Sequence, residues 1–127
     1  MSEESIETEI QAKGLTAARI TPQMIDDQIA AEYFMNAKNA LDALGCPVDS
    51  RLKVLTICVL VLKNGYVVTG ESACASPENY DDEIGCKIAF ENARNKIWAL
   101  EGYLLKSIIS GRAGWTNGDD ENGACNT

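Results

Sequence analysis

Histidine is absent from this sequence, and neither its cysteines nor its glycines have the spacing of a known reactive or binding motif. Without histidine there is no His-dependent catalytic triad, and the commonest general base and metal ligand are missing. The five cysteines include no close-spaced pair of the kind that binds zinc or exchanges disulfides, so we expect free thiols, mostly buried. No glycine-rich phosphate-binding loop occurs. We therefore expect a protein that is not an enzyme and that holds no metal or cofactor.

The sequence also lacks a long apolar run and an excess of bases. The longest apolar run, Val54–Leu62, is too short to span a membrane as a helix, and the acidic N-terminus does not resemble a signal peptide. Eleven basic residues stand against 19 acidic ones, for a net charge of −8. This balance argues against duplex nucleic-acid partners. Because the sequence also lacks a signal peptide and a membrane-spanning run, we expect a cytoplasmic protein without a membrane partner. Between Lys87 and Arg112, however, basic residues outnumber acidic ones, so a compact anionic ligand stays possible.

The chain length predicts one domain between two acidic ends. Residues 1–20 and 113–127 have the composition of disordered segments, which leaves 21–112 as a single α+β domain. Thr21-Pro22 is typical of a helix start, and apolar residues recur at helical spacing up to Leu44, so we expect one helix over 21–44. Gly45 is placed to end that helix.

Asn64-Gly65, between two apolar β-branched runs, predicts a hairpin with a two-residue type I′ turn. In that register Val61 faces Val68 and Val59 faces Gly70. One face of the first strand, with Leu55, Ile57, Val59 and Val61, is the more cleanly apolar, so we expect the helices to cover it. A two-stranded sheet is marginal alone, so we leave room for one extra short strand.

A long helix is predicted from Ser76–Asn79 to Ser110-Gly111. It carries one broad apolar stripe and a second apolar flank at Trp98, Leu105 and Ile109, which is more than one core needs. We therefore expect a helix-mediated homo-oligomer. The remaining narrow stripe is small and polar, and it consists of Glu91, Asn92, Asn95, Ala99, Gly102 and Lys106.

This helix supplies the candidate binding residues. A nucleotide base could be contacted by Asn92, Asn95 and Tyr80, an aromatic residue just before the helix. Basic side chains of the helix are suited to contact phosphates. The candidate cations are Arg94, Lys96, Lys106 and Arg112. The alternative is an ordinary solvated helix face. The acids at Asp81, Asp82 and Glu83 are better explained as helix N-terminal charges than as a metal site.

Three segments carry a family resemblance. Residues 60–74, 76–85 and 89–105, together with Ile20-Thr21-Pro22, resemble the signature of the phage gene-product 49/66 family over roughly residues 20–106. The resemblance implies a phage or prophage product in a bacterial cytoplasm, and it supplies no catalytic residues.

The layout of hairpin and long helix is also similar to that of phage Thoeris anti-defence proteins, oligomeric sponges that hold cyclic ADP-ribose-type signals between subunits. This likeness implies a protein that sequesters a small cyclic nucleotide without turning it over. Two alternatives stay open: a phage interaction protein that inhibits a host protein, and a small accessory phage protein without a ligand.

Overall fold

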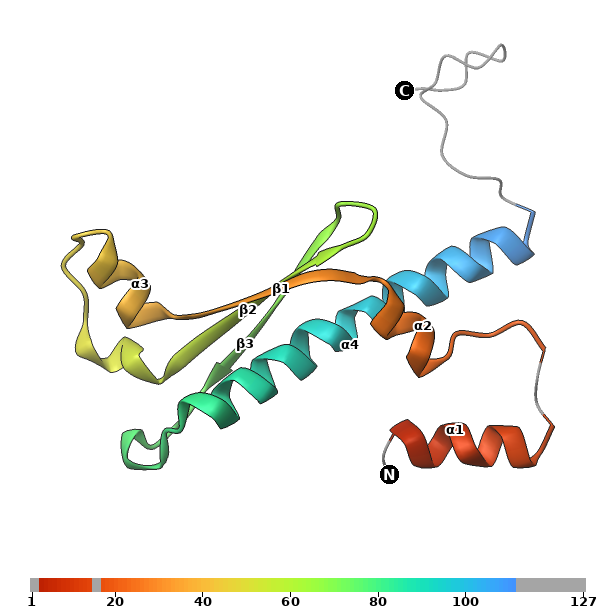
Figure 1. The fold of residues 1–127 in the computed structure, drawn as a ribbon, viewed down its shortest axis with the longest axis horizontal. Helices are drawn as coiled ribbons and strands as arrows, with labels where there is room; N and C mark the ends of the chain where they lie inside the picture. The colour runs from red at the N-terminus through yellow and green to blue at the C-terminus, as the bar shows by residue number, and fades with distance from the viewer. Residues whose placement is uncertain (1–2, 15–16, 112–127) are drawn as a thin grey trace, which may run out of the picture.

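The body of the fold is a three-stranded antiparallel sheet with one long helix across one face (Figure 1). The computed structural model describes residues 3–14 and 17–111. In chain order the elements are α1 (Glu3–Ala12), α2 (Pro22–Asp27), β1 (Ile29–Asn36), α3 (Ala37–Ala43), the 3₁₀ helix η1 (Ser50–Val54), β2 (Leu55–Leu62), β3 (Val67–Ala73), the 3₁₀ helix η2 (Pro77–Asn79) and α4 (Asp82–Ile109). The predicted α+β class, hairpin and long C-terminal helix are confirmed.

Residues 21–44 do not form one helix, so that prediction is wrong. Thr21 does cap a helix, because its side chain accepts a hydrogen bond from the Met24 N–H at 3.3 Å, but α2 is only six residues long. Residues 29–36 then pair with β2 as the edge strand of the sheet, and α3 follows. The spacing of apolar residues is compatible with a helix, yet the β-branched and aromatic residues of this segment also suit a strand. Pairing with β2, a partner distant in sequence, decides between them.

The turn between β2 and β3 has three loop residues where two were predicted. The Leu62 N–H donates to the Tyr66 carbonyl, and the Gly65 N–H donates to the Leu62 carbonyl, both at 2.8 Å. Gly65 has a φ of 89°, which places it at the left-handed position of a bulged hairpin turn. The Asn64 side chain accepts from the Tyr66 N–H at 2.9 Å. The register therefore moves by one residue, and Val61 faces Val67 rather than Val68.

The face of the sheet that α4 covers is the opposite of the predicted one. The buried side of β2 carries Thr56, Cys58, Leu60 and Leu62, and these pack with Val68 on β3 and with Ala89, Ala93 and Ile97 on α4. The close approach of α4 to the sheet, rather than the apolar content of the two faces, explains which face is covered. A Cβ built on Gly70 would lie 2.2 Å from the Ala93 nitrogen and 2.4 Å from the Ala89 carbonyl oxygen, so the helix backbone rests directly on β3.

The other face of the sheet is open along most of its length. Leu55, Ile57, Val59 and Val61 are only half-buried there, and Tyr33 on β1 is exposed. Among the described residues, α4 is the only helix that runs along the sheet, and it lies on the opposite side (Figure 1).

The ends of the described chain are held by side-chain contacts with α4 and by helix caps. Residues 3–12, predicted to be disordered, form α1, and Glu3 bonds to two side chains of α4. The Asp81 side chain caps α4 by accepting from the Ile84 N–H at 3.0 Å, as expected for helix N-terminal acids. The helix ends before Gly111, which has a φ of 83°, close to the predicted end. The acidic tail 113–127 lies outside the described residues.

Candidate functional site

Four of the predicted site residues lie on one exposed face of α4. Because a helix advances 100° per residue, Asn92, Asn95, Lys96 and Lys106 share an arc of about a third of the circumference, and all four are exposed. The Asn92 amide donates to the Glu71 carbonyl at 2.8 Å and is therefore held against β3. Within the described part of the chain, no ion pair involves Lys96 or Lys106. Arg112 lies outside the described residues.

Arg94 points away from that face and into the molecule. Its guanidinium donates to a Glu3 carboxylate oxygen and to an Asp26 carboxylate oxygen, each at 2.8 Å, and to the Pro22 carbonyl at 3.2 Å. The residue is only 5% exposed. The hydrogen bond to Glu3, followed by the one to Asp26, raises the pKa of Arg94 above its ordinary value against the opposing effect of burial. The charge predicted to contact phosphate is thus satisfied by internal carboxylates.

Tyr80 is placed at the start of α4, away from the other candidates. Its hydroxyl donates to an Asp82 carboxylate oxygen, accepts from the Asn36 amide at 3.1 Å and lies 3.3 Å from the Thr56 hydroxyl. These bonds join β1, β2 and the first turn of α4, which gives Tyr80 a structural role. At 1.5 Å per residue, Asn92 lies about 15 Å along the helix from Asp82, its first residue, and Lys106 lies about 21 Å beyond Asn92. A single chain therefore does not bring all of the predicted residues together.

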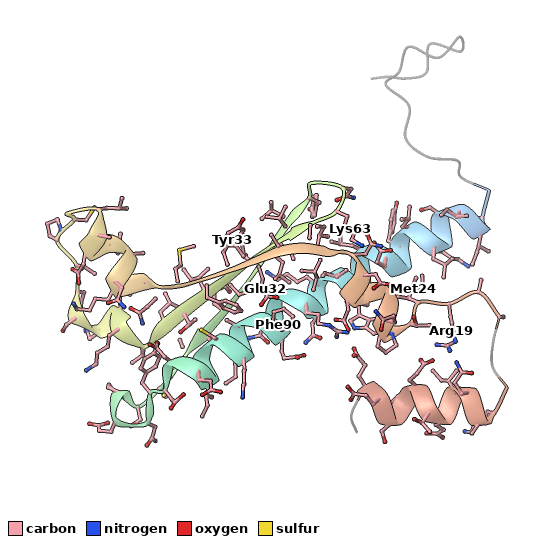
Figure 2. The ribbon with its side chains drawn as sticks, viewed as in Figure 1. Arg19, Met24, Glu32, Tyr33, Lys63 and Phe90 are labelled. Carbon is pink, nitrogen blue, oxygen red and sulfur yellow. The ribbon has the colours of Figure 1, made fainter. Side chains whose placement is uncertain are left out.

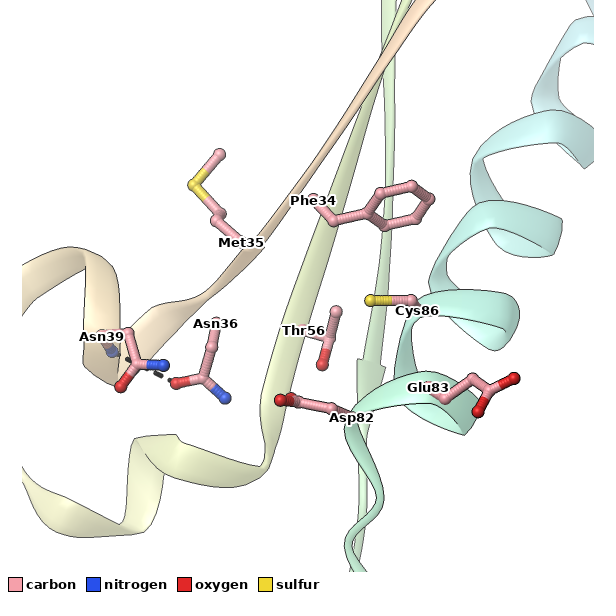
Figure 3. Close-up of a pocket in the computed structure, with 8 residues that line it drawn as sticks. All are labelled: Phe34, Met35, Asn36, Asn39, Thr56, Asp82, Glu83 and Cys86. Atoms are coloured by element: carbon pink, nitrogen blue, oxygen red, sulfur yellow. Dashed lines mark hydrogen bonds between the residues drawn. The ribbon is translucent and has the colours of Figure 1, made fainter.

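A groove between β1 and α4 was not predicted. Its first part is a pocket of about 410 Å³ beside the Tyr80 hydroxyl, lined by Asn36, Thr56, Asp82 and Cys86 among others (Figure 3). Asn36 is fixed there because its side-chain oxygen accepts from the Asn39 N–H at 3.2 Å. Residues of β1 form one wall of this pocket. Because residues 29–36 were predicted to be helical, they were not expected in the sheet beside α4.

The groove continues along α4 as a second pocket of about 390 Å³, which shares Phe34, Glu83 and Cys86 with the first. Its floor is apolar, and its rim carries Glu32, Glu83 and Glu91 with a single base, Lys87. Glu32 on β1 and Phe90 on α4, both labelled in Figure 2, line the pocket from the two elements. With Lys87 already 3.4 Å from Glu83, the groove is acidic and suits a cationic or hydrogen-bond-donating group rather than a phosphate.

No group of three or more potential ligands among the described residues is arranged to hold a metal ion. The described helices also include none with the length and apolarity needed to cross a membrane.

The geometry defines an α+β protein in which one long helix packs on a three-stranded sheet that contains a bulged hairpin. Residues 20–109 match the phage protein (N4 Gp49/phage Sf6 gene 66) family, and the chain belongs to that family. The predicted phage family is thus confirmed. No curated protein and no solved structure matches the chain.

Proposed function

We propose that this phage protein is a non-enzymatic anti-defence protein, which binds a cyclic nucleotide signal of the cyclic ADP-ribose type in the host cytoplasm and withholds it. Family membership supports the phage setting. The nucleotide-binding part of the proposal depends on the polar face of α4.

The observation that carries the proposal is the combination of side chains on that face. Asn95 and Lys96 are adjacent, exposed and one turn from Asn92. Amides can donate and accept at the edge of a base, and an unpaired lysine attracts a phosphate as a point charge. Ala99 and Gly102, on the same side one and two turns later, leave the helix backbone accessible to a flat ligand.

A single helix face is convex, so a ligand held there needs a second wall. We propose that a second copy of the chain provides it, with Lys96 and Lys106 contacting the phosphates. Ile109 is 58% exposed near the end of α4, about 40° around the helix from Asn95, and gives two such helices an apolar contact beside the polar face. Arg94 has the separate role of holding α1 and α2 to α4.

Isothermal titration with a panel of cyclic ADP-ribose isomers tests this proposal. We expect heat with a fixed stoichiometric ratio and recovery of unchanged nucleotide. Because a hydrogen bond to a charged group contributes about 1.5–3 kcal/mol, Lys96→Ala should weaken binding at least about tenfold. Lys87→Ala is the matched control on the same helix, since Lys87 is 72% exposed and lies outside the polar face. Absence of heat across the panel, turnover of the nucleotide, or an equal loss with the control contradicts the proposal.

A second candidate is a protein that inhibits a host protein, and the acidic groove favours it. Glu32, Glu83 and Glu91 around an apolar floor suit a basic segment of a partner. Capture of one host protein that is lost with Glu83→Lys and Glu91→Lys, together with no heat from the nucleotide panel, supports this candidate over the first.

A further inference from the structure

β1 is an edge strand with an unusual run of exposed apolar residues. It pairs with β2 alone. Tyr33, Phe34 and Met35 follow one another and are 58%, 39% and 40% exposed. Successive residues of a strand point to opposite faces, so no single covering layer reaches all three. Only a strand added at the edge of β1 flanks them on both faces.

The edge also lacks the features that usually prevent strand addition. Residues 29–36 contain no proline and no lysine, and Glu32 is their one charge. The only irregularity in pairing lies between Ile29 and Ala31, at the start of the strand. From Ala31 to Asn36 the outer row of backbone N–H and C=O groups is regular and has no neighbouring strand among the described residues.

We propose that β1 pairs antiparallel with β1 of a second copy about a two-fold axis perpendicular to the sheet. The two sheets then join into one of six strands, with both α4 helices on the same face. In such a pair, opposed residues point to the same face. The register that centres on Tyr33 places it opposite Tyr33 of the second copy and Met35 opposite Ala31. The register that centres on Glu32 is disfavoured because it opposes two carboxylates.

A second copy suits this edge better than an unrelated strand because the edge is self-complementary. A large side chain, Met35, meets a small one, Ala31, twice across the axis, and the glutamates are offset. The pairing also places the two acidic grooves next to each other over the joined β1 strands. Figure 2 shows Glu32 on the side of β1 that faces α4 and Tyr33 on the opposite side, so both faces of the junction gain contacts.

Sedimentation equilibrium of the full chain tests the pairing with a matched pair of variants. Tyr33 and Tyr66 are 58% and 57% exposed, but Tyr66 lies at the hairpin turn rather than on β1. We expect a wild-type dimer. Tyr33→Lys places two like charges opposite each other and should weaken the dimer at least about tenfold, whereas Tyr66→Lys should not. Circular dichroism should show that both variants are folded.

Cross-linking tests the register. In a Cys46→Ser, Cys125→Ser background, Tyr33→Cys should form a disulfide-linked dimer with oxidised glutathione, because opposed Cα atoms about 4.5–5.5 Å apart are within reach of a disulfide. Tyr66→Cys in the same background should not. A monomeric wild-type chain, or a dimer that Tyr33→Lys leaves intact, overturns the inference. A dimer that Tyr33→Lys leaves intact contradicts only this pairing, whereas a monomeric wild-type chain also removes the second wall that the nucleotide proposal requires.

Discussion

Arg94 and Glu3 are 91 residues apart in the chain, and their side chains are joined by a hydrogen bond of 2.8 Å. The Trp98 indole N–H donates to the same Glu3 oxygen at 3.0 Å. One carboxylate oxygen therefore accepts from two side chains that lie one turn apart on α4. This contact attaches α1 to the middle of the long helix, and the second carboxylate on Arg94, from Asp26, attaches α2 in the same place.

Replacement of Arg94 should destabilise the fold. Arg94→Met leaves Glu3 and Asp26 together without their cation, and we expect a loss of about 2–3 kcal/mol in the free energy of unfolding. Arg94→Lys should recover only part of this, because a lysine cannot reach three acceptors as the planar guanidinium does. Urea denaturation measures both. Arg51→Met is the control, since Arg51 is 88% exposed and should have no measurable effect. Equal stability of Arg94→Met and wild type would contradict the internal role.

Addition of a single methyl group at Gly70 should strongly lower the free energy of unfolding. An added Cβ would overlap the backbone of α4 at Ala89 and Ala93, and backbone cannot yield as a flexible side chain does. We expect Gly70→Ala to lose about 3 kcal/mol or more in thermal or urea unfolding.

The matched control is Gly102→Ala on the exposed side of α4. A Cβ there meets nothing within 4 Å, and alanine favours a helix over glycine by about 1 kcal/mol. The control should therefore be as stable as the wild type or more so. A mild effect at Gly70 would show that α4 does not rest on β3.

The anchoring of α1 should weaken in acid. Glu7 accepts from two nitrogens of Arg19 at 2.8 and 2.7 Å, and this pairing, with a smaller contribution from Gln11, lowers the pKa of Glu7 from 4.5 to about 2. A lowered pKa stabilises the folded state above pH 4.5, and this contribution is lost as the pH falls toward 2. NMR titration of the Glu7 carboxyl should show a midpoint near 2. Arg19→Gln should return it toward 4.5, and a wild-type midpoint already near 4.5 would contradict the contact.

The thiols should differ in reactivity. Cys46 is exposed, whereas burial raises the pKa of Cys58 to about 11. At pH 8 only about one Cys58 thiol in a thousand is then ionised, and the thiolate is the reactive form. Iodoacetamide labelling followed by peptide mass spectrometry should modify Cys46 in the native protein and Cys58 only after unfolding. Native labelling of both at similar rates would show that the β2 face under α4 is not closed.

The local elements could be predicted from the sequence where short-range chemistry decides. The Asn64-Gly65 turn places the hairpin, and Thr21 and Gly111 mark helix ends because capping and positive φ depend on a few neighbouring residues. The predicted start of the long helix at Ser76–Asn79 is too early, since a 3₁₀ helix occupies Pro77–Asn79 and α4 begins at Asp82. The turn type was wrong because the same two residues also serve a three-residue bulged loop. That difference of one residue moved the whole register.

The parts that depend on distant contacts could not be predicted in this way. β1 has helical spacing and becomes a strand through β2, and the buried sheet face is chosen by the close approach at Gly70 rather than by apolar content. The candidate site shows the same limit. Arg94 looked like a free cation because its carboxylate partners, Glu3 and Asp26, are 91 and 68 residues away in the sequence.

The close contact between α4 and Gly70 also constrains where the exposed groups of α4 lie relative to the sheet. Because the backbones of Gly70 and of α4 lie against each other at Ala89 and Ala93, no flexible side chain separates them there, and the position of α4 relative to β3 is closely constrained. In any assembly built on that edge, the separation of the two lysine-bearing helix faces is then determined inside each subunit, before the subunits meet.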